Sequence, residues 1–187
     1  MQTLMVHLQW NEPSPMVEDL LVSLYPYMVK IESDTTHLLF RVEQESIPLP
    51  LEDLHDLLVT DFQLHFTLLV MPEQAYALLE KPMWLPLIEA LKPGYYDIET
   101  ALIQGRRHQP DLFSTLKERL NTRLSQTDIT TVLALASANM ILSTAAKNLY
   151  IHRNTMLYRL EHITRVTGID VKTFKGLFIL YSVYKMV

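Results

Sequence analysis

The residues of this chain best suited to chemistry lie close together near its C-terminal end. Residues 152–165 include an asparagine, threonines, a tyrosine and three arginines. Asparagine can form two hydrogen bonds with adenine, arginine can do so with guanine, and threonine can contact the thymine methyl group. Arginine, lysine and tyrosine can also hold phosphates, which positions a protein on DNA without reading its sequence. These residue types therefore suit the edges and the backbone of a DNA duplex.

Two helices joined by a tight turn are expected to position these side chains. Ser143 can cap a first helix of about two turns, and Ala145-Ala146 has so little bulk that a second helix can cross it closely. Tyr150-Ile151 is the predicted turn, with Ile151 directed into the core. The second helix is predicted over residues 152–166, and Gly168 ends it as a glycine C-cap. This order is typical of a helix-turn-helix, whose second helix enters the major groove.

The second helix has one apolar face and one polar face when residues are placed about 100° apart. The apolar side carries Met156, Leu157, Leu160 and Ile163. The polar side carries Asn154, Tyr158, Glu161, His162 and Arg165, with Thr155 at its edge. An apolar stripe alone is ordinary for a surface helix, but amide, hydroxyl, imidazole and guanidinium groups together favour contact with DNA. The predicted DNA-binding residues are Lys147, His152, Arg153, Asn154, Thr155, Tyr158, Arg159 and Arg165.

Several of these residues have an alternative interpretation as structural residues. Arg153 and Arg159 flank the apolar stripe and could pair with acids or helix ends of the same domain. His152 could cap the helix instead of reading a base, and Lys147 could be a solvated lysine. Arg165 could form an ion pair with Glu161, four residues before it, worth about 0.3 kcal/mol.

The segment from about Thr130 to Met186 resembles the C-terminal helix-turn-helix of PucR/CdaR-type bacterial regulators of purine catabolism and sugar diacids. The resemblance is carried without a gap by Ala145-Ala146, His152-Arg153-Asn154-Thr155, Tyr158-Arg159-Leu160 and Gly168-Ile169-Asp170. It covers about a third of the chain, and the sequence departs from it at Asn139-Met140, where a glycine is expected. The resemblance implies a DNA-binding transcriptional regulator, usually multimeric, whose upstream region senses a small molecule or a partner.

Charge divides the chain into two parts. Residues 1–110 hold six Lys and Arg against sixteen Asp and Glu, a net −10, whereas residues 111–187 hold ten against five, a net +5. Only the basic part suits a polyanion. We therefore expect an acidic α+β regulatory or dimerisation domain over residues 1–105. A connector helix follows over 106–126, and an all-α helix-turn-helix domain over 127–187.

The N-terminal domain is expected to be ferredoxin-like, with element order β-α-β-β-α-β and both helices on one face of the sheet. The expected elements are a strand over 4–10, a helix from Pro15 capped by Ser14, strands over 28–32 and 38–42, a helix over 51–62 and a strand over 64–70. Residues 73–91 add helical pieces, which Pro82 and Pro86 are expected to break. No strand is expected from Asp97 onward.

A stripe of leucines marks the connector helix. Leu112, Leu116, Leu120 and Leu124 repeat every four residues, a spacing that could join the two modules or pair with a second copy of the chain. Together with the small footprint of a single recognition helix, this stripe predicts a homodimer on a palindromic DNA site. Thr127-Asp128 is expected to cap the following helix.

Composition narrows the remaining classes of function. The chain has no cysteine, which excludes disulfides and thiolate zinc sites and fits the cytoplasm. No signal peptide or membrane-spanning run is found. No His, Asp or Glu stands at the spacing of metal ligands around His55 or His65. The sequence shows no set of catalytic residues and no glycine-rich phosphate loop. We expect neither a cofactor nor an enzyme. The alternatives are a protein-interaction or dimerisation module with a degenerate helix-turn-helix, or a relative of nucleotide cyclases. An unknown small-molecule effector is a further expected partner.

Overall fold

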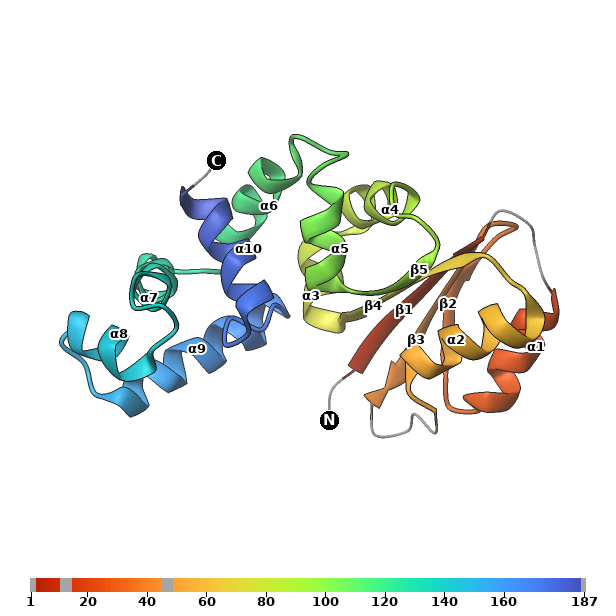
Figure 1. Cartoon of the computed structure of the whole chain (residues 1–187), viewed down its shortest axis with the longest axis horizontal. Coiled ribbons are helices and arrows are strands. Elements are labelled where there is room, and N and C mark those ends of the chain that lie inside the picture. The colour runs from red at the N-terminus through yellow and green to blue at the C-terminus, as the bar shows by residue number, and fades with distance from the viewer. Residues whose placement is uncertain (1–2, 11–14, 45–48, 186–187) are drawn as a thin grey trace.

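The computed structural model describes residues 3–10, 15–44 and 49–185, which form a five-stranded sheet followed by a helical part (Figure 1). The elements up to the last strand are β1 (Thr3–Trp10), α1 (Pro15–Leu24), β2 (Val29–Ser33), β3 (His37–Glu43), α2 (Leu51–Phe62), β4 (Phe66–Pro72), α3 (Glu73–Leu79), α4 (Lys81–Glu89) and β5 (Gly94–Asp97). The helices after it are α5 (Ile98–Gly105), α6 (Leu112–Asn121), α7 (Gln126–Ser137), α8 (Leu142–Asn148), α9 (Arg153–Thr167) and α10 (Phe174–Lys185). The predicted Ser14 cap lies outside the described residues.

The sheet confirms the predicted ferredoxin-like arrangement and adds one strand to it. Its strand order is β2-β3-β1-β4-β5. β1 pairs antiparallel with both β3 and β4, and β2 pairs antiparallel with β3. The fifth strand was not predicted: β5 pairs in parallel with β4, and Tyr96 in it is buried. The sequence gives little sign of β5 because it is four residues long and follows Lys92-Pro93, which resembles a stop.

The two faces of the sheet are covered by different helices. Val6, Leu8 and Phe40 point to the face that α1 and α2 cover, where they pack with Leu21 and Leu58. This confirms that both early helices lie on one side. The opposite face is covered by α3, α4 and α5 (Figure 1).

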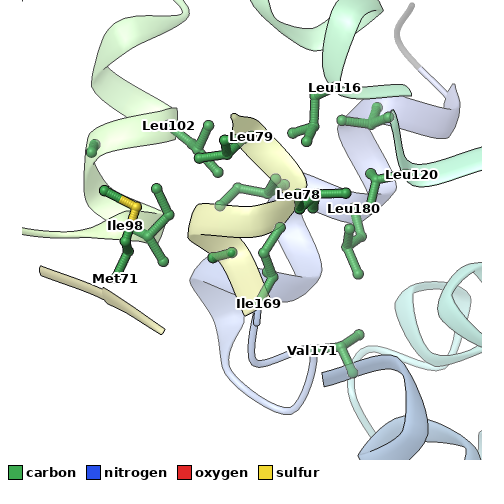
Figure 2. Packing of buried hydrophobic residues seen from close by; sticks show 14 of the residues in the cluster. Met71, Leu78, Leu79, Ile98, Leu102, Leu116, Leu120, Ile169, Val171 and Leu180 are labelled. Atoms are coloured by element: carbon green, nitrogen blue, oxygen red, sulfur yellow. The ribbon is translucent and has the colours of Figure 1, made fainter. Parts of the chain in front are cut away.

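A second, larger core runs from this opposite face into the helical part. Figure 2 shows Leu78 and Leu79 of α3 lying between Met71 of β4 on one side and Leu120 and Leu180 of α6 and α10 on the other. The same cluster continues to buried residues of α7 and α9. Helix α3 therefore joins the sheet to the helix-turn-helix by apolar contact.

The leucine stripe of α6 belongs to this core. Leu112, Leu116, Leu120 and Leu124 are all buried within the single chain, with exposed fractions of 0 to 6%. The expectation that the stripe could pair with a second copy is therefore wrong. Its partners are helices of the same chain, including α3 and α10.

The prolines of α4 and the N-terminal cap of α7 also differ from expectation. Pro82 lies in the first turn of α4 and Pro86 inside it, and the helical run breaks instead at Glu80, whose φ is 54°. Helix α7 begins at Gln126, one residue before the predicted Thr127-Asp128 cap, with Ser125 as the N-cap in a capping box with Asp128. Asp128 takes part as the third residue of that box and is buried.

Candidate nucleic-acid interface

Helices α8 and α9 form the predicted helix-turn-helix, with α8 and the beginning of α9 at the end of the molecule that lies farthest from the sheet (Figure 1). Ala145 and Ala146 are buried, as their small size predicts for a close helix crossing. Met156, Leu160 and Ile163 are buried on the inner side of α9. The predicted apolar face of the second helix is therefore confirmed for these three residues, whereas Leu157 is only half-buried. Ser143 is not the cap of α8: it is exposed in the first turn, after Ile141 as the N-cap.

The turn between α8 and α9 is closed by backbone hydrogen bonds. The Tyr150 N–H donates to the Lys147 carbonyl at 3.1 Å, and the Ile151 N–H donates to the Ala146 carbonyl at 3.0 Å. Ile151 is partly buried and packs against the core, as predicted. Tyr150 adopts a left-handed conformation with φ of 53°, and 97% of its side chain is exposed.

His152 caps α9, which was one of the two roles predicted for it. Its Nδ1 atom accepts a hydrogen bond from the Asn154 backbone N–H at 3.2 Å. This contact satisfies one of the free N–H groups of the first turn. The remaining N–H groups and the helix dipole give this end of α9 a partial positive charge, which favours a phosphate.

The first turn of α9 presents its side chains to solvent. Arg153, Asn154 and Thr155 are exposed, and Tyr158 is 66% exposed. None of these four side chains makes a hydrogen bond or an ion pair with another described residue. The alternative in which Arg153 pairs with an acid of its own domain is thus not seen within residues 3–10, 15–44 and 49–185. Arg159 is half-buried, and Lys147 on α8 is exposed.

The far end of α9 is occupied by contacts within the protein. Arg165 Nη2 donates to His162 Nδ1 at 3.1 Å, and His162 Nε2 lies 4.0 Å from the Asp128 carboxylate. Arg165 and Glu161 form no ion pair in the described part of the chain, so that expectation is wrong. Gly168 ends the helix in a left-handed conformation, with φ of 72°, which confirms the predicted C-cap.

Polar contacts join the end of β5 and the start of α5 to α10 and to the segment that precedes α10. Lys175 Nζ donates to Asp97 Oδ2 at 2.9 Å and to Thr100 Oγ1 at 2.7 Å. The Asp170 N–H donates to Glu99 Oε1 at 3.1 Å. Burial is the main influence on the Glu99 pKa and raises it. Burial also acts to raise the Asp97 pKa, but hydrogen bonds from Thr100 and Lys175 together outweigh it and hold that pKa below its usual value.

The remaining histidines lie outside the helix-turn-helix. No group of three or more His, Cys, Asp or Glu residues that could hold a metal occurs among the described residues. Sequence reasoning did not single out the pair formed by His7 and His37, whose Nε2 and Nδ1 atoms lie 3.0 Å apart. His7 is buried against Trp84, and burial, reinforced by His37, lowers its pKa from 6.5 to about 3. It is a neutral core histidine at neutral pH.

Comparisons with known proteins identify the C-terminal part of the chain. Residues 129–186 match the family model described as the PucR C-terminal helix-turn-helix domain. The uncharacterized protein YxkF of Bacillus subtilis (strain 168) is 30% identical over 82 residues, covering 38% of this chain and 28% of that protein. The chain thus spans little more than a quarter of the length of this curated relative.

A solved structure gives a more distant match. It is described as a regulator of polyketide synthase expression from Bifidobacterium adolescentis, and it shares 18% identity with this chain at a TM-score of 0.44. The match covers 98% of this chain and 79% of that one. Within the described residues, no helix combines the length and the apolar character that a membrane crossing requires.

Proposed function

We propose that this chain, whose residues 129–186 form a PucR C-terminal helix-turn-helix domain, is a transcriptional regulator that binds specific duplex DNA through α9. One observation carries the proposal. The first turn of α9 is exposed and its polar side chains have no partner among the described residues, while the opposite side of the helix is buried in the core. A helix held in this way can insert its leading end into the major groove without rearrangement.

The side chains of this turn divide into two roles. We propose that Asn154 and Thr155 contact base edges, where an asparagine reads adenine and a threonine reads thymine. In this proposal Arg153, Tyr158 and Lys147 hold the phosphates on either side of the groove. Arg159 is half-buried and Arg165 already contacts His162, so both act at the margin of the site. His152 contributes through its cap on the helix rather than through a base.

A single recognition helix covers few base pairs, so we propose that two copies bind a palindromic site with half-sites about 34 Å apart or a multiple of that distance. The buried leucine stripe of α6 provides no support for this homodimer. We also propose that residues 1–105 form a regulatory domain for a small-molecule effector and that the protein acts in the cytoplasm, where its operator lies. Nothing in the site supports an enzymatic role for the chain.

Selection of genomic DNA fragments with the purified full-length protein tests the proposal. A shared sequence among the recovered fragments, bound with an affinity that falls steeply as salt rises, is the expected result, because phosphate contacts release counterions. Weak binding of DNA fragments that depends neither on their sequence nor on salt would favour the protein-interaction module and would contradict the proposal.

A further inference from the structure

The turn between α8 and α9 is a Schellman motif with an unusual residue at its left-handed position. In this motif two backbone bonds close the end of a helix, one from the left-handed residue and one from the residue after it. Tyr150 and Ile151 make these bonds to Lys147 and Ala146, as described above. The left-handed position is most often glycine, because a β-carbon is disfavoured there. Here it is Tyr150, with φ of 53°.

No contact with the described residues explains the tyrosine. Its side chain is 97% exposed, the highest value among the exposed large apolar side chains of the described residues, and it makes no hydrogen bond with any of them. The motif's apolar contact with the core comes from Ile151 instead. The ring thus adds nothing to packing, while its β-carbon makes the backbone less stable. Residues in disfavoured conformations are often found at functional sites.

The position of Tyr150 indicates what the side chain contacts. The turn lies at the same end of the molecule as the first turn of α9 (Figure 1), two residues before its N-cap His152. The hydrogen bonds of the turn hold the Tyr150 backbone in place. The Tyr150 side chain therefore extends beside the first turn of α9. A phenolic hydroxyl there can donate a hydrogen bond to a phosphate oxygen, a contact that positions the helix without reading a base.

We infer that Tyr150 is a DNA-backbone anchor, whose hydroxyl donates to a phosphate beside the groove that α9 enters. This inference rests on the proposed function and adds a contact from the turn to those from α9 and Lys147. Because the contact is with the DNA backbone, it strengthens binding to specific and non-specific DNA equally. Because tyrosine carries no charge, it leaves the salt dependence of binding unchanged.

Two substitutions in the full-length protein separate this role from a structural one. Tyr150→Phe removes only the hydroxyl, and Tyr150→Gly removes the ring and relieves the left-handed backbone. Binding is measured by titration on a duplex recovered by genomic-fragment selection and on a scrambled duplex of equal length. Both variants should weaken both complexes by about tenfold, the effect expected when one hydrogen bond to a charged group is lost. The melting temperature of Tyr150→Gly should be no lower than that of the parent.

Tyr27→Phe provides the matched control, since Tyr27 is 76% exposed but lies between α1 and β2 of the sheet part. If Tyr150→Phe binds as tightly as the parent while Asn154→Ala loses the selected duplex, the anchor is wrong and the proposed function stands. If the parent protein selects no shared DNA sequence, both the Tyr150 anchor and the proposed function are wrong.

Discussion

Gly168, the C-cap of α9, lies directly against Ala75 of α3. A β-carbon built on Gly168 would come within 2.5 Å of the Ala75 nitrogen and 2.8 Å of its β-carbon. The glycine therefore does two things at once: it supplies the left-handed turn that ends α9, and it lets the helix-turn-helix approach the helix that covers the sheet. The contact places the C-terminal end of α9 against α3.

Replacing Gly168 by alanine should destabilise the protein by about 3 kcal/mol, because the left-handed strain adds to the overpacking against Ala75. Urea unfolding of the two proteins measures the difference. Gly168→Asn is the informative companion, since asparagine tolerates the left-handed conformation but keeps the β-carbon. It should recover only part of the loss, and full recovery would contradict the close approach.

The leucine stripe of α6 should contribute to stability and not to assembly. Leu116→Ala removes a fully buried side chain and should cost about 2–5 kcal/mol. The mass measured by light scattering at a concentration where the variant remains folded should equal that of the parent. Glu118→Ala, on the exposed side of the same helix, should change neither quantity. A change in mass with Leu116→Ala, at unchanged stability, would show that the leucine stripe contacts a second copy of the chain.

Stability should fall on mild acidification because of His7. The unfolded chain binds a proton on this imidazole near pH 6.5, whereas the folded protein does so only near pH 3. The unfolded state therefore binds more protons between these values, and stability is lost as pH falls from 6.5 toward 3. At pH 5 the loss from this group should be about 2 kcal/mol. The charged and titratable groups around it are His37, Asp34 and Lys81.

Chemical unfolding at a series of pH values tests this prediction. His7→Phe should flatten the curve between pH 7 and pH 5, since phenylalanine fills the space against Trp84 without a titrating group. A variant that loses stability as steeply as the parent over that range would show that other groups cause the acid sensitivity.

Lys147 should act on DNA affinity through charge alone. Lys147→Gln should weaken binding to selected and scrambled duplexes alike and should lower the slope of log affinity against log salt by about one. Lys92→Gln is the matched control, because Lys92 is an exposed lysine of the sheet part. An unchanged slope with Lys147→Gln would mean that this lysine does not meet a phosphate.

Local pattern was sufficient for the features that depend on neighbouring residues. The buried face of α9 follows from its helical spacing, and its end follows from Gly168, because a left-handed C-cap is the usual reason for glycine there. The ferredoxin-like order follows from alternating strands and two amphipathic helices. These features involve contacts that each element makes with its own sequence neighbours or with one face of the sheet.

The remaining features depend on partners far away in the sequence. β5 is a strand only because β4 offers a free edge for parallel pairing, and four residues carry too little pattern to show it. The leucines of α6 are equally apolar whether they meet α3 or a second chain. Tyr150 was expected only to form a turn, and its proposed contact with DNA follows from its left-handed backbone and its exposure. A tyrosine after a helix end, where glycine is usual, was the available signal.

The most direct measurement is the affinity of Asn154→Ala for a selected duplex and for its scrambled counterpart. The loss of a bidentate base contact should cost about 1–3 kcal/mol on the selected duplex and leave the scrambled duplex almost unaffected. Gln104→Ala, which removes an exposed amide from α5, should change neither affinity. If Asn154→Ala binds the selected duplex as tightly as the parent does, the first turn of α9 does not read DNA.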